Sequence, residues 1–110
     1  MIKNDVTLSL VIPCFNEEEA ILKFYEETLK VLRIMGFEAA DESEFIFIDD
    51  GSTDKTLSII KELAEKDSKV HYVSFSRNFG KEAGLYAGLV KARGDYIAVM
   101  DADLQDPPSL

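Results

Sequence analysis

The segment EFIFIDDGSTD, residues 44–54, carries two local signals from which the fold of this chain can be worked out. Its first half is a short, almost continuous apolar run, which predicts a buried strand that ends near Asp49. Its second half, DGSTD, is rich in turn-forming residues, and Ser52 or Thr53 is expected to cap a helix over residues 55–66. A strand, a turn and a helix in this order form the first part of a βαβ unit.

The same alternation continues on both sides of this segment. Upstream, LSLVIP predicts a strand, and the helix after it should be capped by Asn16, carry Glu17–Glu19 in its first turn and end at Gly36. The acidic residues 38–44 then form a solvated connection. This alternation predicts right-handed crossovers and an α/β fold, with a parallel sheet of about four strands and flanking helices. The expected order is strand, helix, strand, helix, strand, helix and strand, over residues 8–13, 17–35, 44–49, 55–66, 69–75, 81–92 and 95–100.

Composition excludes several classes of protein. The chain has 110 residues, 46% of them hydrophobic, which is enough for one domain with a core. A net charge of −9 argues against nucleic-acid binding and against this segment lying on an anionic membrane. The single cysteine, Cys14, cannot form an internal disulfide, and the first residues lack the features of a signal peptide, so we expect a cytoplasmic, reducing environment. No apolar run reaches the ~20 residues that a membrane span needs.

Residues with the chemistry of a ligand site follow every predicted strand. In open α/β sheets, ligands bind outside the carboxyl ends of the strands. Carboxylate and amide oxygens gathered there are hard ligands for Mg²⁺ or Mn²⁺, and such an ion would bridge them to a diphosphate. The residues are Pro13, Phe15, Asn16 and Glu17 after the first strand, Asp49, Asp50, Ser52 and Asp54 after the second, Arg77, Asn78 and Lys81 after the third, and Asp101, Asp103, Gln105 and Asp106 after the fourth.

Each of these groups, taken alone, also has a purely structural interpretation. Asp49–Ser52 could be only a tight turn with a cap, Asp101–Asp103 a turn cluster, and Asn16–Glu19 a capped first turn. Arg77 and Lys81 could be ordinary surface charges. Their joint placement at one edge of the sheet is what favours a ligand site.

Two other α/β folds that bind nucleotides or metals do not fit. A dinucleotide-binding domain needs G-x-G-x-x-G after its first strand, but this chain has PCFNEEE there, and its glutamates would repel a pyrophosphate. A phosphoacceptor receiver domain needs an acidic pair after its first strand and an acceptor Asp after its third. Here the clustered acids follow the second and fourth strands, so the register is wrong.

The ordered set VIPCFNEE, FIDDGSTDKT, SRNFGKEAG and MDADLQDPP resembles the family-2 glycosyltransferases with the GT-A fold. Within that family it is similar to the group of dolichyl-phosphate mannosyltransferases and polyprenyl-phosphate glucosyltransferases. The likeness extends from about Thr7 to Leu110, and DADLQDPP and SRNFGKEA are specific to the group. The DAD element is a form of the family's D-x-D motif.

The resemblance assigns a role to each matching position. Pro13, Phe15 and Glu17 would line the nucleotide pocket, and Ile48 and Asp50 would contact the base. Asp101 and Ala102 would lie against the ribose and diphosphate, and Lys81 and Arg77 would lie near the nucleotide. Asp103 and Gln105 would bind Mg²⁺ or Mn²⁺, and Asp101 and Asp103 would be the catalytic carboxylates.

The resemblance further implies a hexosyltransferase that moves a sugar from a UDP- or GDP-sugar to a polyprenyl phosphate, with inversion, in cell-envelope glycan synthesis. Residues 1–110 would form the N-terminal donor-binding part of a GT-A domain, truncated before an acceptor-binding part and any membrane helices. The full protein would act at the cytoplasmic face of a membrane. The segment alone is expected to be inactive and to self-associate through an unpaired sheet edge. The residues select neither the sugar nor the base, and a non-catalytic nucleotide-binding or regulatory module is the alternative function.

Overall fold

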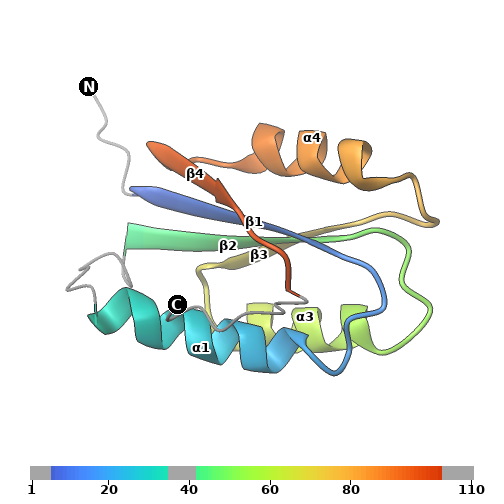
Figure 1. Cartoon of the computed structure of the whole chain (residues 1–110), viewed down its shortest axis with the longest axis horizontal. Coiled ribbons are helices and arrows are strands. Elements are labelled where there is room, and N and C mark those ends of the chain that lie inside the picture. The colour runs from blue at the N-terminus through green and yellow to red at the C-terminus, as the bar shows by residue number, and fades with distance from the viewer. Residues whose placement is uncertain (1–5, 35–41, 103–110) are drawn as a thin grey trace.

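A computed structural model of the chain describes residues 6–34 and 42–102. Strands and helices alternate along these residues in the predicted order (Figure 1). The boundaries of the strands lie close to the predicted ones, whereas the first helix starts later than expected. The elements are β1 (Leu8–Cys14), α1 (Ile21–Ile34), β2 (Ser43–Asp49), α3 (Thr56–Lys66), β3 (Val70–Ser74), α4 (Lys81–Lys91) and β4 (Tyr96–Val99).

The strands form one four-stranded sheet in the order β3-β2-β1-β4, and every neighbouring pair is parallel. The predicted parallel α/β fold is therefore confirmed. α1 and α3 cover one face of the sheet, and α4 covers the other (Figure 1). The chain leaves β3 at one edge and returns through α4 to β4 at the other, so the strand order reverses beside β1. Ligands of open α/β sheets bind at such a switch point, outside the carboxyl ends of the strands.

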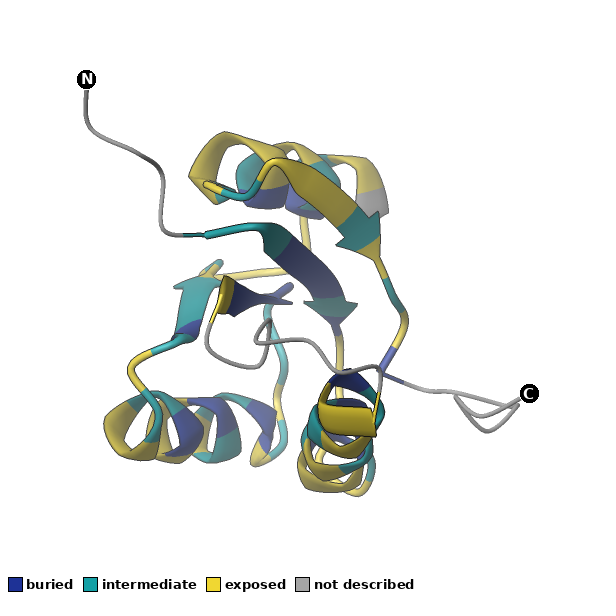
Figure 2. Ribbon diagram, turned by 90° about the vertical axis from the view of Figure 1, so that its left-hand side faces the viewer, coloured by how far each residue is buried: buried dark blue, intermediate teal, exposed yellow. Residues whose placement is uncertain are grey.

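The central position of β2 explains why residues 44–49 are apolar almost throughout. β2 lies between β1 and β3, and all of its residues are buried (Figure 2). Because side chains alternate along a strand, Phe45 and Phe47 pack in the cluster beneath α1 and α3, whereas Ile46 and Ile48 pack on the face that α4 covers. The two phenylalanine rings stack with their centroids 6.1 Å apart. A strand that is buried on both faces carries apolar side chains on both, so its sequence does not alternate between apolar and polar residues.

The connection from β1 to α1 differs from the prediction. α1 begins at Ile21, because the residues just before it form a turn and not the first turn of the helix. Asn16 does not cap the helix, since its backbone is left-handed with a φ of 52°. The acids Glu17–Glu19 consequently precede the helix. The predicted end of the helix at Gly36 lies outside the described residues.

Polar residues at both ends of β2 also have structural roles that differ from the predicted ones. Ser43, expected in a solvated connection, belongs to β2 and is buried, and Glu44, expected where that connection meets the strand, is buried as well. At the other end, neither Ser52 nor Thr53 caps α3, whose N-cap residue is Lys55 and makes no side-chain cap. The side chains of Glu44 and Ser52 bond instead to groups far away in the sequence.

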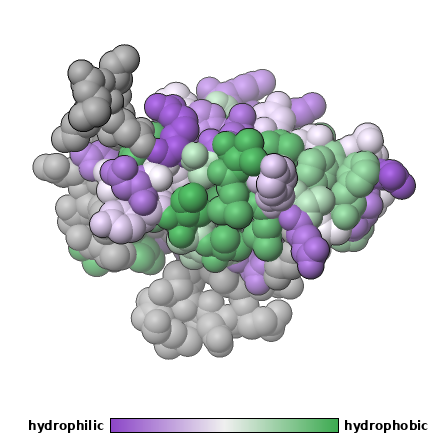
Figure 3. Space-filling view, turned by 90° about the horizontal axis from the view of Figure 1, so that it is seen from above, coloured by the Kyte–Doolittle hydropathy of each residue, from purple (hydrophilic) through white to green (hydrophobic). Residues whose placement is uncertain are grey.

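α4 and β4 expose apolar side chains on the outer side of the molecule. Tyr86 and Val90 project from α4, and Tyr96 and Val99 from the edge strand β4. Figure 3 shows the molecule from the side of α4, with apolar side chains gathered over the middle of this face. Self-association through this region stays a prediction. Within residues 6–34 and 42–102, no helix is long and apolar enough to cross a membrane.

Candidate functional site

Acidic side chains gather around the end of β1. The edge of the sheet at which the strands end, at Cys14, Asp49, Ser74 and Val99, is the carboxyl edge. Burial raises the pKa of the Cys14 thiol, and the negative charges of Glu17, Asp49 and Asp101 raise it further. Charges have this effect only when they are near the titrating group. Three segments, after β1, in β2 and after β4, therefore direct carboxylates toward one region.

The region around Cys14 suits a hard cation more than a soft one. Burial and the neighbouring negative charges disfavour the thiolate form of Cys14, and those charges come from carboxylate oxygens. Among residues 6–34 and 42–102, no group of three or more His, Cys, Asp or Glu could hold a metal ion. The charge and the donor atoms fit Mg²⁺ or Mn²⁺, provided that further oxygen ligands come from beyond Ala102.

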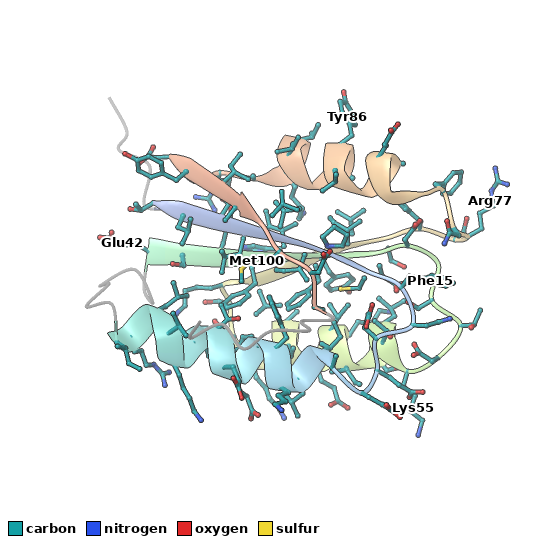
Figure 4. All side chains as sticks on the ribbon, in the orientation of Figure 1. Phe15, Glu42, Lys55, Arg77, Tyr86 and Met100 are labelled. Atoms are coloured by element: carbon teal, nitrogen blue, oxygen red, sulfur yellow. The ribbon has the colours of Figure 1, made fainter. Side chains whose placement is uncertain are left out.

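Residues predicted to line a nucleotide pocket lie along the same edge. Pro13 pairs in register with Ile48 across β1 and β2. Phe15 follows β1 directly and is 44% exposed (Figure 4), while Glu17 is partly buried. The side chain of Ile48 is completely buried beneath α4, with its Cγ2 3.3 Å from where a Cβ would stand on Gly84. Ile48 therefore faces the core beneath α4 and is enclosed between β1 and β3.

The chain continues beside β1 after β4 has ended. The Met100 N–H donates a hydrogen bond to the Val11 carbonyl at 3.0 Å, which guides the following residues to the carboxyl edge. Asp101 is exposed there and Ala102 is buried. The other predicted site residues, Asp103, Gln105 and the side chain of Lys81, lie outside what the structure describes.

Asp50 is bonded to the loop that follows β3. Its Oδ1 accepts a hydrogen bond from the Phe79 N–H at 2.8 Å, and its Oδ2 accepts one from the Gly80 N–H at 3.1 Å. These N–H groups lie at the start of α4, where the helix dipole favours a negative charge. Asp50 is only 8% exposed. It therefore anchors residues 76–80 to the end of β2.

The anchored loop carries an arginine against an aromatic ring. The Arg77 guanidinium carbon lies 4.5 Å from the centroid of the Phe79 ring, and that ring packs edge-on against Phe75 at 5.5 Å. Figure 4 shows Arg77 projecting at the same end of the molecule as Phe15. The carboxyl edge thus combines a cation from one loop with carboxylates from three other segments.

Asp50→Ala is expected to lower the free energy of unfolding by about 1–3 kcal/mol, because two N–H groups lose a charged acceptor. Asp50→Asn keeps one acceptor oxygen, so its free energy of unfolding should fall by less. Chemical denaturation measures both losses, and a nucleoside-diphosphate titration of the same variants measures affinity. A fall in affinity with no change in stability would contradict the anchoring role and would point to direct contact with the base.

Thr56 is a site residue that sequence reasoning missed. It is completely buried, and its hydroxyl accepts the Glu17 N–H at 2.8 Å while donating to Asp54 Oδ1. A signal was present in the sequence: DGSTDKT holds more hydroxyl and carboxylate side chains than one helix cap can use. The excess side chains bond to the loop after β1.

Comparison with known sequences gives a family and a set of relatives. The family model for glycosyl transferase family 2 matches residues 9–110. The prophage bactoprenol glucosyl transferase homolog of Escherichia coli (strain K12) is 51% identical over 100 residues, which cover 91% of this chain and 31% of that protein. The bactoprenol glucosyl transferase of Shigella phage SfV is 50% identical over the same shares of the two chains. The chain therefore spans about a third of the length of the curated relatives that it matches.

Comparison with solved structures agrees with the sequence comparison. The mannosyltransferase PcManGT from Pyrobaculum calidifontis, solved in complex with GDP-Man and Mn²⁺, superposes with a TM-score of 0.72 at 25% identity. The match covers 87% of this chain and 27% of that one. The sheet and its helices therefore have the arrangement of a GT-A transferase. With a family model that matches almost the whole chain, this protein belongs to glycosyl transferase family 2.

Proposed function

We propose that this chain is the donor-binding part of a hexosyltransferase that moves a sugar, glucose by the names of its relatives, from a nucleotide-diphospho-sugar to a polyprenyl phosphate. The observation that carries the proposal is about 50% identity, over 91% of the chain, to proteins named bactoprenol glucosyl transferase. Residues 1–110 would be the N-terminal part of the transferase domain, and the complete protein would work at the cytoplasmic face of a membrane.

The nucleotide would lie across the carboxyl edge, with its base on the side of β2 and its diphosphate beside β4. Phe15 offers a half-exposed ring for the base, and Pro13 and Glu17 lie on either side of it in the sequence. Arg77 would balance the negative charge of the ligand from the loop after β3. UDP and GDP are both compatible with these residues. Asp101 and Ala102 would lie against the ribose and diphosphate.

Asp103 and Gln105 would hold Mg²⁺ or Mn²⁺, in line with the ion that PcManGT binds. A bound divalent ion supplies Lewis-acid chemistry, which neutralises charge on the departing nucleoside diphosphate. Asp101 and Asp103 would orient the donor so that its anomeric carbon faces the acceptor. A phosphate oxygen of the acceptor forms the new bond to that carbon as the bond to the donor diphosphate breaks, which inverts the configuration. The acceptor is already anionic, so a strong general base is less necessary.

Removal of the metal, or Asp103→Ala, is expected to weaken UDP or GDP binding at least about tenfold, because the diphosphate loses the ion that joins it to the carboxylates. Calorimetric titration of the 110-residue chain with each nucleotide, with Mn²⁺ and then with a chelator, measures the effect. Asp95→Ala is the matched control, since it removes an equal charge just before the opposite end of β4. Equal affinity with and without metal, or an equal loss in the control, would contradict the proposal.

A further inference from the structure

The loop after β1 and the loop after β2 are fastened to each other by hydrogen bonds. The Asn16 N–H donates to Ser52 Oγ at 2.9 Å, and the Thr53 N–H donates to Asn16 Oδ1 at 2.8 Å. The backbone of Asn16 is left-handed, with a φ of 52°, a conformation that few residues other than glycine adopt but that asparagine tolerates. The hydrogen bonds to the loop after β2 hold it in this conformation.

Thr56 and Asp54 continue this connection. The Glu17 N–H donates to Thr56 Oγ1 at 2.8 Å, and the same hydroxyl donates to Asp54 Oδ1 at 2.5 Å. Asp54 Oδ2 accepts the Glu18 N–H at 3.2 Å. Burial opposes the ionisation of Asp54, but the hydrogen bonds from Thr56 and Glu18 outweigh it, so the pKa of this carboxyl is lowered. Asp54 is therefore an ionised acceptor at neutral pH.

These bonds distinguish the segment from an ordinary turn. A turn that only starts a helix satisfies its own N–H groups. Here Ser52, Asp54 and Thr56 accept hydrogen bonds from N–H groups that lie 36 to 39 residues earlier in the chain. The N–H groups that they hold belong to the residues directly after Phe15.

We infer that Ser52–Thr56 is a positioning element for the nucleotide pocket: its side chains hold the main chain of Asn16, Glu17 and Glu18, and this sets the place of Phe15 and Glu17 at the carboxyl edge. Ser52, Asp54 and Thr56 are positioning residues and do not touch the nucleotide. The inference rests on the proposed function, since it concerns the same nucleotide. When a pocket already has its binding conformation before the ligand arrives, no part of the binding free energy is lost in ordering the pocket.

The test is Thr56→Val, which replaces the hydroxyl by a methyl group of similar size and leaves the Glu17 N–H without this acceptor. In the 110-residue chain with Mn²⁺, we expect UDP or GDP to bind about five- to tenfold more weakly, as for one lost hydrogen bond. Hydrogen exchange at the Glu17 amide should become faster. Thr56→Ser keeps the hydroxyl and should bind the nucleotide like the parent chain.

Tyr25→Phe is the matched control for a general loss of stability. It removes the hydrogen bond from the Tyr25 hydroxyl to Asp67 Oδ2, 2.6 Å long, which joins α1 to the end of α3 opposite to Thr56. This variant should unfold more easily but bind nucleotide as tightly as the parent.

The outcomes separate the inference from the proposed function. Weak binding by Thr56→Val, with parent-like binding by Thr56→Ser and Tyr25→Phe, supports the inference. If Thr56→Val binds nucleotide like the parent, the inference is overturned and the proposed function still stands. The same holds if Tyr25→Phe loses as much affinity as Thr56→Val. If the parent chain binds neither UDP nor GDP, both the inference and the proposed function are overturned.

Discussion

Glu44→Ala is expected to lower the free energy of unfolding by about 3–5 kcal/mol, because it removes a buried acceptor on which several groups depend. Glu44 is 2% exposed. Its Oε2 accepts hydrogen bonds from Ser9 Oγ at 2.6 Å and from the Arg93 N–H at 2.7 Å. Ser9 Oγ in turn accepts the Gly94 N–H at 2.7 Å, and the other carboxylate oxygen lies 3.7 Å from His71 Nε2.

This network explains why the expected loss is large. It joins β1, β2 and β3 to the turn at Arg93 and Gly94 that leads into β4, and β4 delivers Asp101 to the carboxyl edge. Without the carboxylate, the Ser9 hydroxyl and the Arg93 N–H would lose this acceptor in a site that water does not reach easily. The loss should therefore loosen the start of β4 as well as the sheet.

Chemical denaturation of Glu44→Ala beside Glu42→Ala measures the effect of the network. Glu42 precedes β2 by one residue and is exposed (Figure 4), and its Oε2 accepts a hydrogen bond from the Thr7 hydroxyl at 3.0 Å. An exposed bond of this kind contributes about 0.5 kcal/mol or less. Similar losses in the two variants would show that the buried network is not what stabilises this end of the sheet.

Gly51→Ala is expected to lower the free energy of unfolding by about 2–4 kcal/mol, because both the backbone and the surroundings of Gly51 exclude a side chain. The φ of Gly51 is +75°. A Cβ there would lie 2.4 Å from the carbonyl carbon of Arg77 and 2.5 Å from the nitrogen of Asn78. The obstacle is main chain, which cannot rotate away as the end of a side chain can. The loop that Asp50 anchors would have to move.

Gly80→Ala is the matched control for Gly51→Ala. Gly80 also has a positive φ, +97°, but a Cβ there would meet no atom within 4 Å. It should lose only the conformational part, about 1–3 kcal/mol, because a φ of +97° with a ψ of 162° is adopted almost only by glycine. A larger loss in Gly51→Ala than in Gly80→Ala measures the contact between the end of β2 and residues 77–78. If the losses are equal, that contact has no energetic importance.

Much of the fold follows from local patterns in the chain. The apolar run at 44–49 and the turn residues after it predicted a buried strand followed by a helix, and both exist. The alternation of strands and helices predicted a parallel sheet, because a crossover helix is the usual way to join parallel strands. The charges at the strand ends predicted an acidic carboxyl edge, and the carboxylates of Glu17, Asp49 and Asp101 do act together on Cys14. These features depend on neighbours in the sequence and on a general rule of topology.

The partners of the polar side chains could not be predicted in the same way. Glu44 stands among acidic residues in the sequence, which favours a solvated connection, yet it bonds to Ser9 and to Arg93, 35 and 49 residues away. Ser52 has the local pattern of a helix cap, yet its hydroxyl and that of Thr56 bond to the loop after β1. The physical reason is that a hydroxyl or carboxylate bonds to whichever N–H group the folded chain brings within about 3 Å. In this protein the pairing of β1 with β2 and with β4 brings those groups together, and only the tertiary structure places them there.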